Sequence, residues 1–252
     1  MKHLAISIDA QQVRFDCLVD KDVTQNLILD FSSENLENQV EEIDTFLNSN
    51  DSLNVAWDAI TLSWFNSKST LLPESIFKAC DIHQPYKLAF GDLTEGLELK
   101  YDRIPNVDII NIYSTPALFR TYFIRKFLTI QFLHEGSHFI GFNSTRKIEN
   151  HQLVIAQHNS EYMLMAFEKG NLVYYNFFDQ KNPEDLLYHT AHLIQKLKWE
   201  SPEIKAHFYS LLEEGKTTYS TFTEMCSNIS IFKNTTWSYH KNWRSKIQQA
   251  CV

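Results

Sequence analysis

The pentapeptide at residues 134–138 carries the side chain types that a zinc hydrolase would need. It reads His134-Glu135-Gly136-Ser137-His138 and so fits the His-Glu-x-x-His pattern. In that pattern one helix face presents two imidazoles to zinc, and the glutamate acts as a general base on the water that zinc activates. A zinc-dependent metallohydrolase with His134 and His138 as ligands is therefore one hypothesis.

The surrounding sequence disfavours that hypothesis. In residues 128–133, Leu-Thr-Ile-Gln-Phe-Leu, apolar and polar residues alternate and some side chains are β-branched, which is typical of a strand. Gly136 would cost a helix about 1 kcal/mol relative to alanine. Gly141 fits the metzincin extension of the motif, but Ser144 stands where that extension places its third histidine. We therefore predict no metal site here, and the metallohydrolase is the least favoured alternative.

Two other groups of side chains could bind ligands but have simpler interpretations. His189 and His192 are spaced to share a helix face, yet no further metal ligand accompanies them, so a half-exposed helix is the simpler interpretation. Consecutive aromatic residues could stack on bases, but in a strand they are more often core on one face and interface on the other. The aromatic residues concerned are Tyr174, Tyr175, Phe177 and Phe178.

The end of the chain differs in charge from the rest. After Glu224 there is no acidic residue, and the basic residues are Lys233, Lys241, Arg244 and Lys246. This segment therefore carries +4, which leaves −12 for the remainder (−8 minus +4). Trp237, Tyr239 and Trp243 lie among the basic residues. One interpretation is a tail that docks on an acidic partner or on the body of the protein, and the other is an ordinary packed or frayed terminus.

Length and composition limit the possible functions. The chain has 252 residues, of which 44% are hydrophobic and 21% charged, as expected of a globular protein with a full core. The net charge of −8 argues against a nucleic-acid partner, which usually requires a basic face. Only 6 glycines are present, so few loops have the glycine that close approach of the backbone to a phosphate requires.

The cellular compartment can also be predicted. The four cysteines, Cys17, Cys80, Cys226 and Cys251, are widely spaced and include no Cys-x-x-Cys pair, as expected of thiols in a reducing cytosol. The N-terminal segment reaches Asp9 too soon for a secretion signal, and no window approaches the roughly 20 apolar residues of a membrane span. We predict a cytoplasmic protein with no membrane span.

Two similar series of elements are predicted, one in each half of the chain. The first is three strands and a helix, at 4–8, 13–19, 27–31 and from Ser32-Ser33-Glu34 onward. The second begins about 148 residues later, with strands at 153–156, 161–167 and 172–178 and a helix that starts at Asn182-Pro183. This repetition predicts a duplicated α/β fold, in which each half is a mixed sheet flanked by helices. The polar run 143–150 is the predicted joint.

Further elements complete each half. In the first half, strands are predicted at 86–90, 97–101 and 107–113, followed by a helix from Pro116 to Phe127. In the second half, the predictions are a strand at 206–211, a helix at 218–226 and a short final strand at 229–232. The predicted domains are a first subdomain at 1–146, a second at 147–233 and a basic, aromatic C-terminal tail at 234–252.

Several short motifs, in order along the chain, are shared with a known family. They are Asp108-Ile109-Ile110-Asn111-Ile112-Tyr113-Ser114 before a helix, Asn176-Phe177-Phe178 followed by Glu184, Asp185 and Tyr188, Leu71-Leu72-Pro73, and His134 at a strand end. To about Phe232 the chain resembles the bacterial family called domain of unknown function 3822. The resemblance implies an actin-like ATPase fold of two ribonuclease-H-like subdomains with a cleft between them. Relatives of similar shape include cytoplasmic scaffold domains of type II secretion and pilus assembly machines, but the resemblance implies no activity.

The fold that the resemblance implies would place a nucleotide at the tips of two hairpins. In active actin-like ATPases each tip typically reads Asp-x-Gly, where backbone N–H groups grip phosphate and the carboxylate serves magnesium. Here the tips read Asp9-Ala10-Gln11 and Gln157-His158-Asn159, so both lack the glycine and one lacks the acid. The only glycine near the expected adenosine wall is Gly215, and Glu213 and Glu214 before it would repel a triphosphate.

We therefore predict that the ATP site is absent and that no residue binds a cofactor or metal or acts in catalysis. Asp9 is interpreted as an acid at a hairpin tip with a solvated carboxylate. The predicted function is that of a non-catalytic, degenerate actin-like protein that acts through an unknown protein partner or as an assembly scaffold. The first alternative is a nucleotide-binding actin-like ATPase, and the second is the zinc hydrolase that would use His134, Glu135 and His138.

Overall fold

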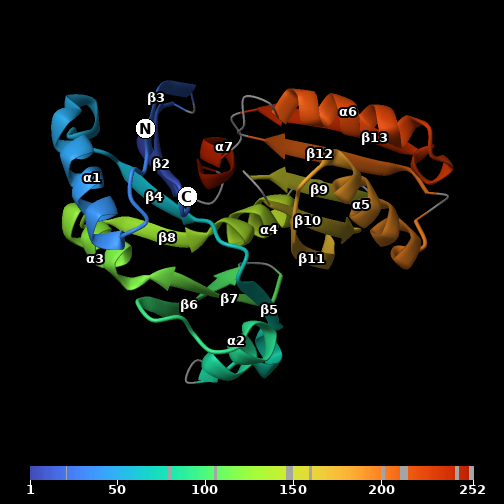
Figure 1. Cartoon of the computed structure of the whole chain (residues 1–252), viewed down its shortest axis with the longest axis horizontal. Helices are drawn as coiled ribbons and strands as arrows, with labels where there is room; N and C mark the ends of the chain where they lie inside the picture. Colours follow the sequence, from blue (N-terminus) through green and yellow to red (C-terminus); the bar gives the residue numbers. More distant parts are fainter. Residues whose placement is uncertain are drawn as a thin grey trace. The chain divides into compact units, whose positions relative to one another are not determined.

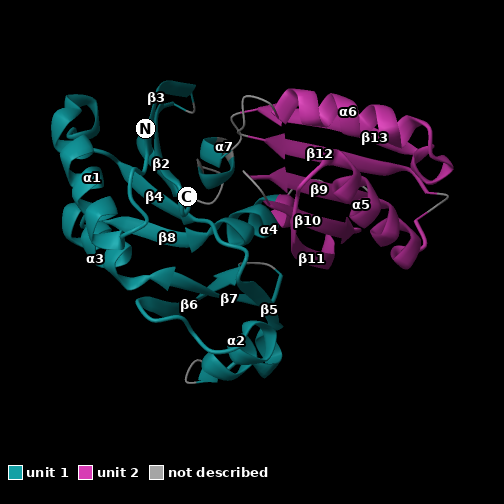
Figure 2. Ribbon diagram, viewed as in Figure 1, with its two compact units in different colours: residues 1–142, 244–252 teal, residues 143–243 magenta. Residues whose placement is uncertain are grey.

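The computed structural model divides the chain into two compact units, coloured separately in Figure 2. Unit 1 is Met1–Phe142 together with Arg244–Val252, and unit 2 is Asn143–Trp243. The structure describes all residues except 21, 79–80, 105–106, 146–149, 159–160, 200–201, 211–214, 242–243 and 250–252. Part of the predicted joint at 143–150 therefore lies outside the described residues.

A five-stranded mixed sheet forms the centre of unit 1, in the order β3-β2-β1-β4-β8 (Figure 1). Its strands are β1 (Lys2–Ile8), β2 (Gln12–Val19), β3 (Asp22–Asp30), β4 (Ala59–Trp64) and β8 (Ile130–His134). The strands β1, β2 and β3 are antiparallel neighbours, whereas β4 pairs in parallel with β1 and with β8. The three predicted N-terminal strands are confirmed, although β3 begins earlier than its apolar alternation indicated.

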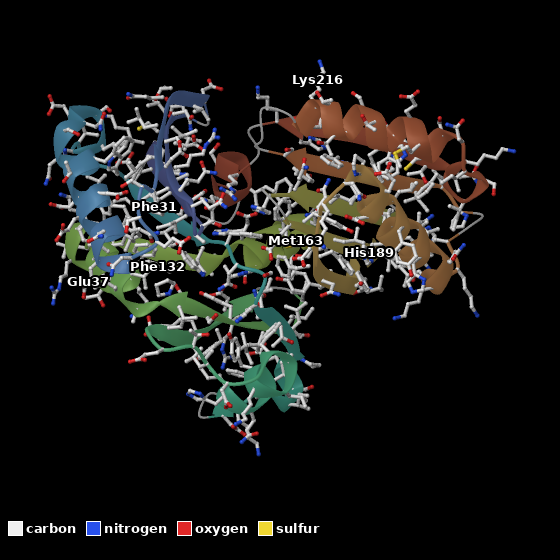
Figure 3. The ribbon with its side chains drawn as sticks, in the orientation of Figure 1. Phe31, Glu37, Phe132, Met163, His189 and Lys216 are labelled. Atoms are coloured by element: carbon white, nitrogen blue, oxygen red, sulfur yellow. The ribbon has the colours of Figure 1, made fainter. Side chains whose placement is uncertain are left out.

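One face of this sheet carries the apolar core of unit 1. Strand alternation directs every second side chain of β1 to that face, and these residues are Leu4, Ile6 and Ile8. The helices α1 (Leu36–Ser49) and α3 (Ala117–Lys126) cover the face and contribute Ile43, Leu47, Phe119 and Phe123 to the core. Phe31 and Phe132, labelled in Figure 3, pack against the same core.

The start of α1 is set by a side-chain cap. Asn35 is the N-cap residue, and its side-chain oxygen accepts the backbone N–H groups of Glu37 (2.8 Å) and Asn38 (3.2 Å). The predicted start at Ser32-Ser33-Glu34 is therefore a few residues too early. Ser33 still contributes, because its hydroxyl oxygen accepts the Asn35 backbone N–H (3.1 Å).

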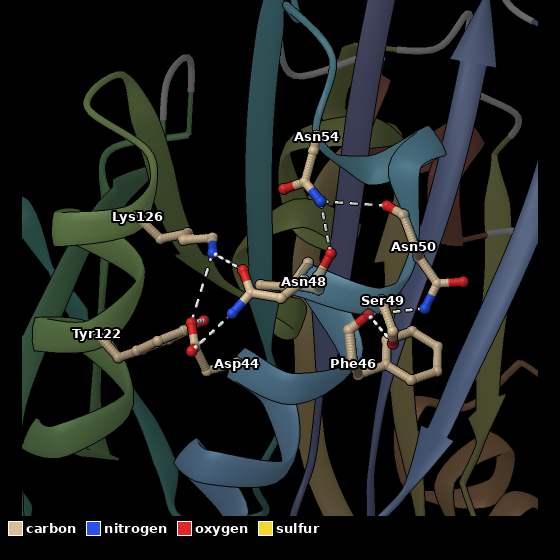
Figure 4. Close-up of polar contacts among 9 residues, drawn as sticks. Asp44, Phe46, Asn48, Ser49, Asn50, Asn54, Tyr122 and Lys126 are labelled. Atoms are coloured by element: carbon tan, nitrogen blue, oxygen red, sulfur yellow. Dashed lines mark hydrogen bonds and ion pairs between the residues drawn. The ribbon is translucent and has the colours of Figure 1, made fainter.

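Polar contacts join α1 to α3 at the surface of unit 1 (Figure 4). The Asp44 carboxylate accepts hydrogen bonds from Tyr122 Oη (2.8 Å) and from Lys126 Nζ (3.4 Å). Lys126 Nζ also donates to Asn48 Oδ1 (2.9 Å). These contacts fix the spacing of the two helices over the sheet.

A smaller antiparallel sheet follows β4 in the chain, in the order β5-β7-β6. Its strands are β5 (Ser69–Pro73), β6 (Leu97–Ile104) and β7 (Ile109–Pro116), and helix α2 (His83–Phe90) packs on one face. The strands predicted at 97–101 and 107–113 are confirmed, but the strand predicted at 86–90 is wrong, because it is the second half of α2. Tyr86 and Phe90 both face the core one helical turn apart, whereas Leu88 between them is 91% exposed.

Unit 2 repeats the strand arrangement of unit 1. Its sheet has the order β11-β10-β9-β12-β13, again with three antiparallel strands and then two parallel pairings. The strands are β9 (His151–Gln157), β10 (Glu161–Glu168), β11 (Asn171–Asp179), β12 (Ile204–Ser210) and β13 (Thr235–Lys241). Helices α5 (Pro183–Leu197) and α6 (Gly215–Ser227) complete the unit. The predicted strands at 153–156, 161–167 and 172–178 are confirmed, as is the strand predicted at 206–211 up to Ser210, since residue 211 lies outside the described residues.

The start of α5 follows the predicted sequence signals. Asn182 is the N-cap residue and Pro183 the first helical residue. The Asn182 side chain accepts the Asp185 backbone N–H (3.0 Å), and the Asp185 carboxylate accepts the Asn182 backbone N–H (3.2 Å). This reciprocal capping box confirms the predicted helix start.

The C-terminal part of the chain corrects one prediction. Residues 229–232, predicted as the final strand, contain a 3₁₀ turn at Ser230–Phe232, and the final strand is β13. The residues of the expected C-terminal tail form β13 and the short helix α7 (Arg244–Gln249). Trp237 and Tyr239 of β13 pack against the apolar core of unit 2, which accounts for the alternation of aromatic residues there.

The strand predicted before the His-Glu-x-x-His motif is confirmed as β8, and helix α4 (Glu135–Thr145) starts directly after it. Within the part of the chain that the structure describes, no helix combines the length and apolar character needed to cross a membrane.

Candidate functional site

The first hairpin tip is closed by its own acidic residue. Asp9 Oδ1 accepts the backbone N–H groups of Gln11 (2.9 Å) and Gln12 (3.0 Å), and the Asp9 N–H donates to the Gln12 carbonyl (3.1 Å). Asp9 is only 7% exposed, so the expectation of a solvated carboxylate is wrong. The side chain forms an Asx turn, so the Gln11 and Gln12 N–H groups are already bonded within the tip.

The second hairpin tip is also occupied by contacts within unit 2. The His158 backbone N–H donates to the Glu161 carbonyl (2.8 Å), and Gln157 Nε2 donates to Gln180 Oε1 (3.3 Å). Gln157 and His158 are both buried. Asn159, the third residue of this tip, lies outside the described residues. The described part of the tip therefore offers an amide and an imidazole, and no carboxylate for a cation.

Gly215 is the first residue of α6, and its lack of a side chain serves packing. A methyl group added there would lie 2.0 Å from Ser210 Oγ and 2.5 Å from Ser210 Cβ, both too close for any side chain. Ser210 is the last residue of β12 and is fully buried. The glycine thus lets α6 start directly against the end of β12. Glu213 and Glu214, expected to repel a triphosphate, lie outside the described residues.

The two histidines of the His-Glu-x-x-His motif do not share one helix face. His134 ends strand β8, and His138 lies within α4. His134 Nδ1 accepts the Gly136 backbone N–H (3.0 Å), so in the neutral ring Nε2 carries the proton and donates it to the Asn66 carbonyl (3.0 Å). His134 Nδ1 therefore fixes the turn from β8 into α4, and Nε2 links this turn to the segment that follows β4.

The glutamate of the motif forms a buried ion pair with the C-terminal helix. Arg244 Nε of α7 lies 2.8 Å from Glu135 Oε2, and both side chains are only 2% exposed. A buried carboxylate requires a counter-charge, since removing an ion from water costs several kcal/mol even after relaxation. In a zinc hydrolase the same carboxylate would have to act on water, whereas here it faces a guanidinium.

His138 is buried beside this ion pair. Burial, opposed in part by the Glu135 charge, lowers the pKa of His138 from 6.5 to about 4. The imidazole is therefore neutral at neutral pH. Among the described residues, no group of three or more histidine, cysteine, aspartate or glutamate side chains could hold a metal ion.

Polar contacts also hold the rest of α7 against β1. Gln248 Nε2 donates to Ser7 Oγ (2.9 Å) and to the Ile6 carbonyl (3.1 Å), and Gln248 Oε1 accepts from Thr61 Oγ1 (2.8 Å). His3 Nε2 completes the chain of hydrogen bonds at 2.8 Å from Thr61 Oγ1. The polar face of the unit 1 sheet is thus covered by side chains from the end of the sequence.

A buried carboxylate that is not among the predicted site residues lies near the start of α4. Asp102 of β6 accepts hydrogen bonds from Tyr113 Oη (3.0 Å), from Ser137 Oγ (2.7 Å) and from the His134 backbone N–H (2.7 Å). Burial raises the pKa of Asp102 to about 6, and the three donors limit that rise. Asn111 Nδ2 donates to Ser137 Oγ (2.9 Å) and extends the network into β7. The sequence signal for this network was the presence of polar residues, Asp102 and Asn111, inside strands whose other side chains form a core.

The family of the chain follows from comparison with known proteins. The family described as "Protein of unknown function (DUF3822)" matches residues 1–229, which is most of the chain. The chain belongs to this family. None of the curated proteins matches this DUF3822 protein in sequence.

Solved structures show the fold of the DUF3822 protein. A Bacteroides thetaiotaomicron protein "with actin-like ATPase fold and unknown function" matches with a TM-score of 0.81 and 13% identity, over 100% of this chain and 96% of that one. The "PilM-PilN type IV pilus biogenesis complex" contains a chain that matches with a TM-score of 0.60 and 7% identity, over 99% and 94%. The ethanolamine utilization protein EutJ from Carboxydothermus hydrogenoformans matches with a TM-score of 0.53 and 5% identity, over 98% of this chain and 88% of that one. The DUF3822 protein therefore has an actin-like ATPase fold, which confirms the predicted fold class.

The histidines of α5 in the DUF3822 protein belong to an aromatic stack. His189, labelled in Figure 3, stacks on Phe178 with ring centroids 4.0 Å apart, and Phe178 stacks on Tyr162 at 5.5 Å. His192 lies parallel to the exposed ring of Tyr188 at 6.2 Å. Burial lowers the pKa of His189. These contacts account for the spacing of the two histidines through packing.

Proposed function

We propose that this DUF3822 protein is a non-catalytic, cytoplasmic protein that acts through contacts with a protein partner, as an assembly scaffold does. The observation that carries the proposal is the closed first hairpin tip. Asp9 Oδ1 accepts the backbone N–H groups of Gln11 and Gln12, two donors of the tip that could otherwise face a phosphate. Hydrogen bonds to a charged group contribute about 1.5–3 kcal/mol each, so a nucleotide would have to compensate for two of them.

The position of Gly215 supports the same conclusion. A glycine that serves nucleotide binding leaves room for the ligand next to its backbone. At Gly215 the room for a side chain is filled by Ser210 Oγ, which would lie 2.0 Å from an added methyl carbon. This glycine therefore shapes the contact between α6 and β12, and the space on its Cβ side is taken by Ser210.

Two observations support a protein partner and a cytoplasmic location. A chain of similar fold belongs to a solved complex of PilM with PilN, so this architecture can present a surface to another protein. Cys17 and Cys226 are both free and buried, as expected in a reducing compartment.

Calorimetry with ATP and magnesium tests the absence of a nucleotide site. We expect no binding heat up to millimolar ATP. The matched variant Gln11→Gly restores the glycine of the Asp-x-Gly pattern while leaving Asp9 in place, and we expect it to remain silent, because Asp9 still occupies the N–H groups. Micromolar binding to the unaltered protein would overturn the proposal in favour of the ATPase.

Two further measurements test the remaining parts. Affinity purification from the native cell, followed by mass spectrometry, is expected to recover a stoichiometric protein partner. If no partner is recovered even after cross-linking, a scaffold role is contradicted. Metal analysis of protein purified without added zinc is expected to find less than one ion per chain. A stoichiometric zinc ion would favour the hydrolase instead.

A further inference from the structure

We propose that the outer edge of β3 binds an extended, basic segment of a partner protein as an added strand. The inference rests on the proposed function, because it names the surface and the chemistry of the protein contact. Strand β3 lies at the end of the unit 1 sheet, and among the described strands it pairs with β2 alone. Addition of a strand to such an edge is a recurrent mode of peptide recognition.

The ladder between β2 and β3 fixes which backbone groups face outward. The Phe31 backbone N–H donates to the Gln11 carbonyl (2.8 Å), so the backbone groups of Phe31 point towards β2. Because the direction alternates along an antiparallel strand, the odd-numbered residues of the regular part of β3 also point towards β2. The residues whose N–H and C=O groups point away from β2 are Asn26, Ile28 and Asp30.

Apolar side chains along this edge are incompletely covered. Ile28 is 45% exposed. Leu27 and Leu29 pack on the margin of the unit 1 core and are only partly buried, so part of each side chain remains exposed. An added strand with alternating apolar side chains would cover them, so the edge offers both hydrogen bonds and apolar contact to an extended peptide.

Most other sheet edges in the described chain carry features that block pairing. Edge strands β5 and β8 have five residues each, and β5 ends in Pro73. Strand β6 carries four charged side chains, and β13 ends in Lys241. Strands β3 and β11 each have nine residues with no lysine and no proline, and the register shift in each lies near its start. These two edges are therefore the least protected, and of the two β3 starts a stretch of sequence, residues 22–67, without lysine or arginine.

Charge identifies the kind of partner. From residue 22 to residue 67 the sequence contains nine acidic residues and no lysine or arginine. Asp22 and Asp30 lie exposed at the two ends of β3. Pairing with a second copy, antiparallel about Asn26, would set Asp22 of one chain opposite Asp30 of the other, which is unfavourable. An extended segment with lysine or arginine at its ends instead meets an acid at each end.

A pair of synthetic peptides tests the inference. The first has nine residues, with alternating valine and threonine and a lysine at each end, and the second replaces both lysines with glutamates. We expect the lysine peptide to bind about ten-fold or more tightly than the glutamate peptide, with an advantage that shrinks as salt is added. Hydrogen exchange is expected to slow at the outward amides of Ile28 and Asp30 when the lysine peptide binds.

Two variants at one position separate backbone pairing from simple apolar contact. Ile28→Pro removes an outward N–H and leaves the ladder to β2 intact, so we expect an affinity loss of about ten-fold or more. Ile28→Thr keeps that N–H, and its loss is expected to stay within about three-fold. The thermal melting of both variants reports whether the fold is kept. If Ile28→Pro unfolds, the double variant Asp22→Lys/Asp30→Lys replaces it and is expected to reverse the preference in favour of the glutamate peptide.

The outcomes that overturn the inference are distinct from those that overturn the proposed function. Equal binding of the two peptides, no binding of either at millimolar concentration, or slowed exchange away from β3 overturns the added strand. So does unchanged affinity in a folded Ile28→Pro variant. Because the peptide titrations contain no nucleotide, micromolar ATP binding would overturn the scaffold proposal and leave the result at β3 unaffected.

Discussion

Two buried side chains of unit 1 are expected to make stability depend on pH in opposite directions. The pKa of Asp102 is raised to about 6 by burial. A raised carboxyl pKa means that the folded state binds the proton more tightly than the unfolded state, so this contribution is present below about pH 4 and is lost as pH rises through 6. We expect the unfolding free energy of the protein, relative to Asp102→Asn, to fall by about 3 kcal/mol between pH 4 and pH 7.

Urea unfolding of both proteins at several pH values measures that difference. Tyr113→Phe is the matched control, because it removes one donor to the Asp102 carboxylate (3.0 Å) and should move the titration midpoint to higher pH. A difference that stays flat from pH 4 to pH 7 contradicts the prediction.

His138 should act in the other direction. Its pKa is lowered to about 4 by burial, so the stability that depends on its neutral form is present above about pH 6.5 and is lost as pH falls towards 4. The unfolding free energy relative to His138→Leu is therefore expected to decrease by about 3 kcal/mol from pH 7 to pH 4. Parallel pH profiles for the two proteins would show that His138 titrates normally.

At the level of elements, the contact between α6 and β12 depends on Gly215. Gly215→Ala places a methyl carbon 2.0 Å from Ser210 Oγ, so one of the two elements has to shift. We expect a loss of about 1–3 kcal/mol in the free energy of unfolding, measured by denaturant titration. In the double variant Ser210→Gly/Gly215→Ala the clash is absent, and most of the loss should be recovered. Equal losses in the single and double variants would refute the steric explanation.

Most elements could be predicted from periodicity, and the exceptions have physical reasons. The strands of both sheets and the start of α5 at Asn182-Pro183 follow from alternation and capping signals. The short apolar run 86–90 fits both strand and helix, and only contacts with the smaller sheet decide for α2. Strand β13 was not predicted, because a segment that mixes aromatic and basic residues fits an exposed tail as well as a strand, although Trp237 and Tyr239 alternate with polar residues.

The site residues were less predictable than the elements. The acid of the first tip, Asp9, could be found from the sequence. Its hydrogen bonds with the Gln11 and Gln12 N–H groups could not, because the same residues can form either an Asx turn or an open loop. The pairing of Glu135 with Arg244 joins distant positions in the chain, and a sequence pattern carries no information on such a contact. The contacts of Asp102 with Tyr113 and Ser137 also join separate elements, so the sequence shows only polar residues within strands and not their partners.

On the scale of the whole molecule, the last residues of the chain belong to unit 1 with the first. The charge of Glu135 is balanced there by Arg244 at 2.8 Å, with both side chains buried. Arg244→Met leaves a buried carboxylate without its counter-charge, and we expect a loss of about 3–5 kcal/mol in unfolding free energy. Hydrogen exchange should accelerate in unit 1 and stay unchanged in unit 2.

The double variant Glu135→Leu/Arg244→Met is the control, since removing both charges leaves no unpaired ion. It is expected to recover most of the lost stability. If the double variant is as unstable as Arg244→Met alone, packing of the arginine stem, and not charge, holds α7 in place.

The return of α7 also has a consequence for synthesis. Translation delivers residues in order, so every residue of unit 2 leaves the ribosome before Arg244 does. Glu135 therefore meets its counter-charge only after all of unit 2 has been made. Completion of the earlier-made unit thus has to wait for the later-made one, and a ribosome stalled before Arg244 would hold unit 1 with the charge of Glu135 unbalanced.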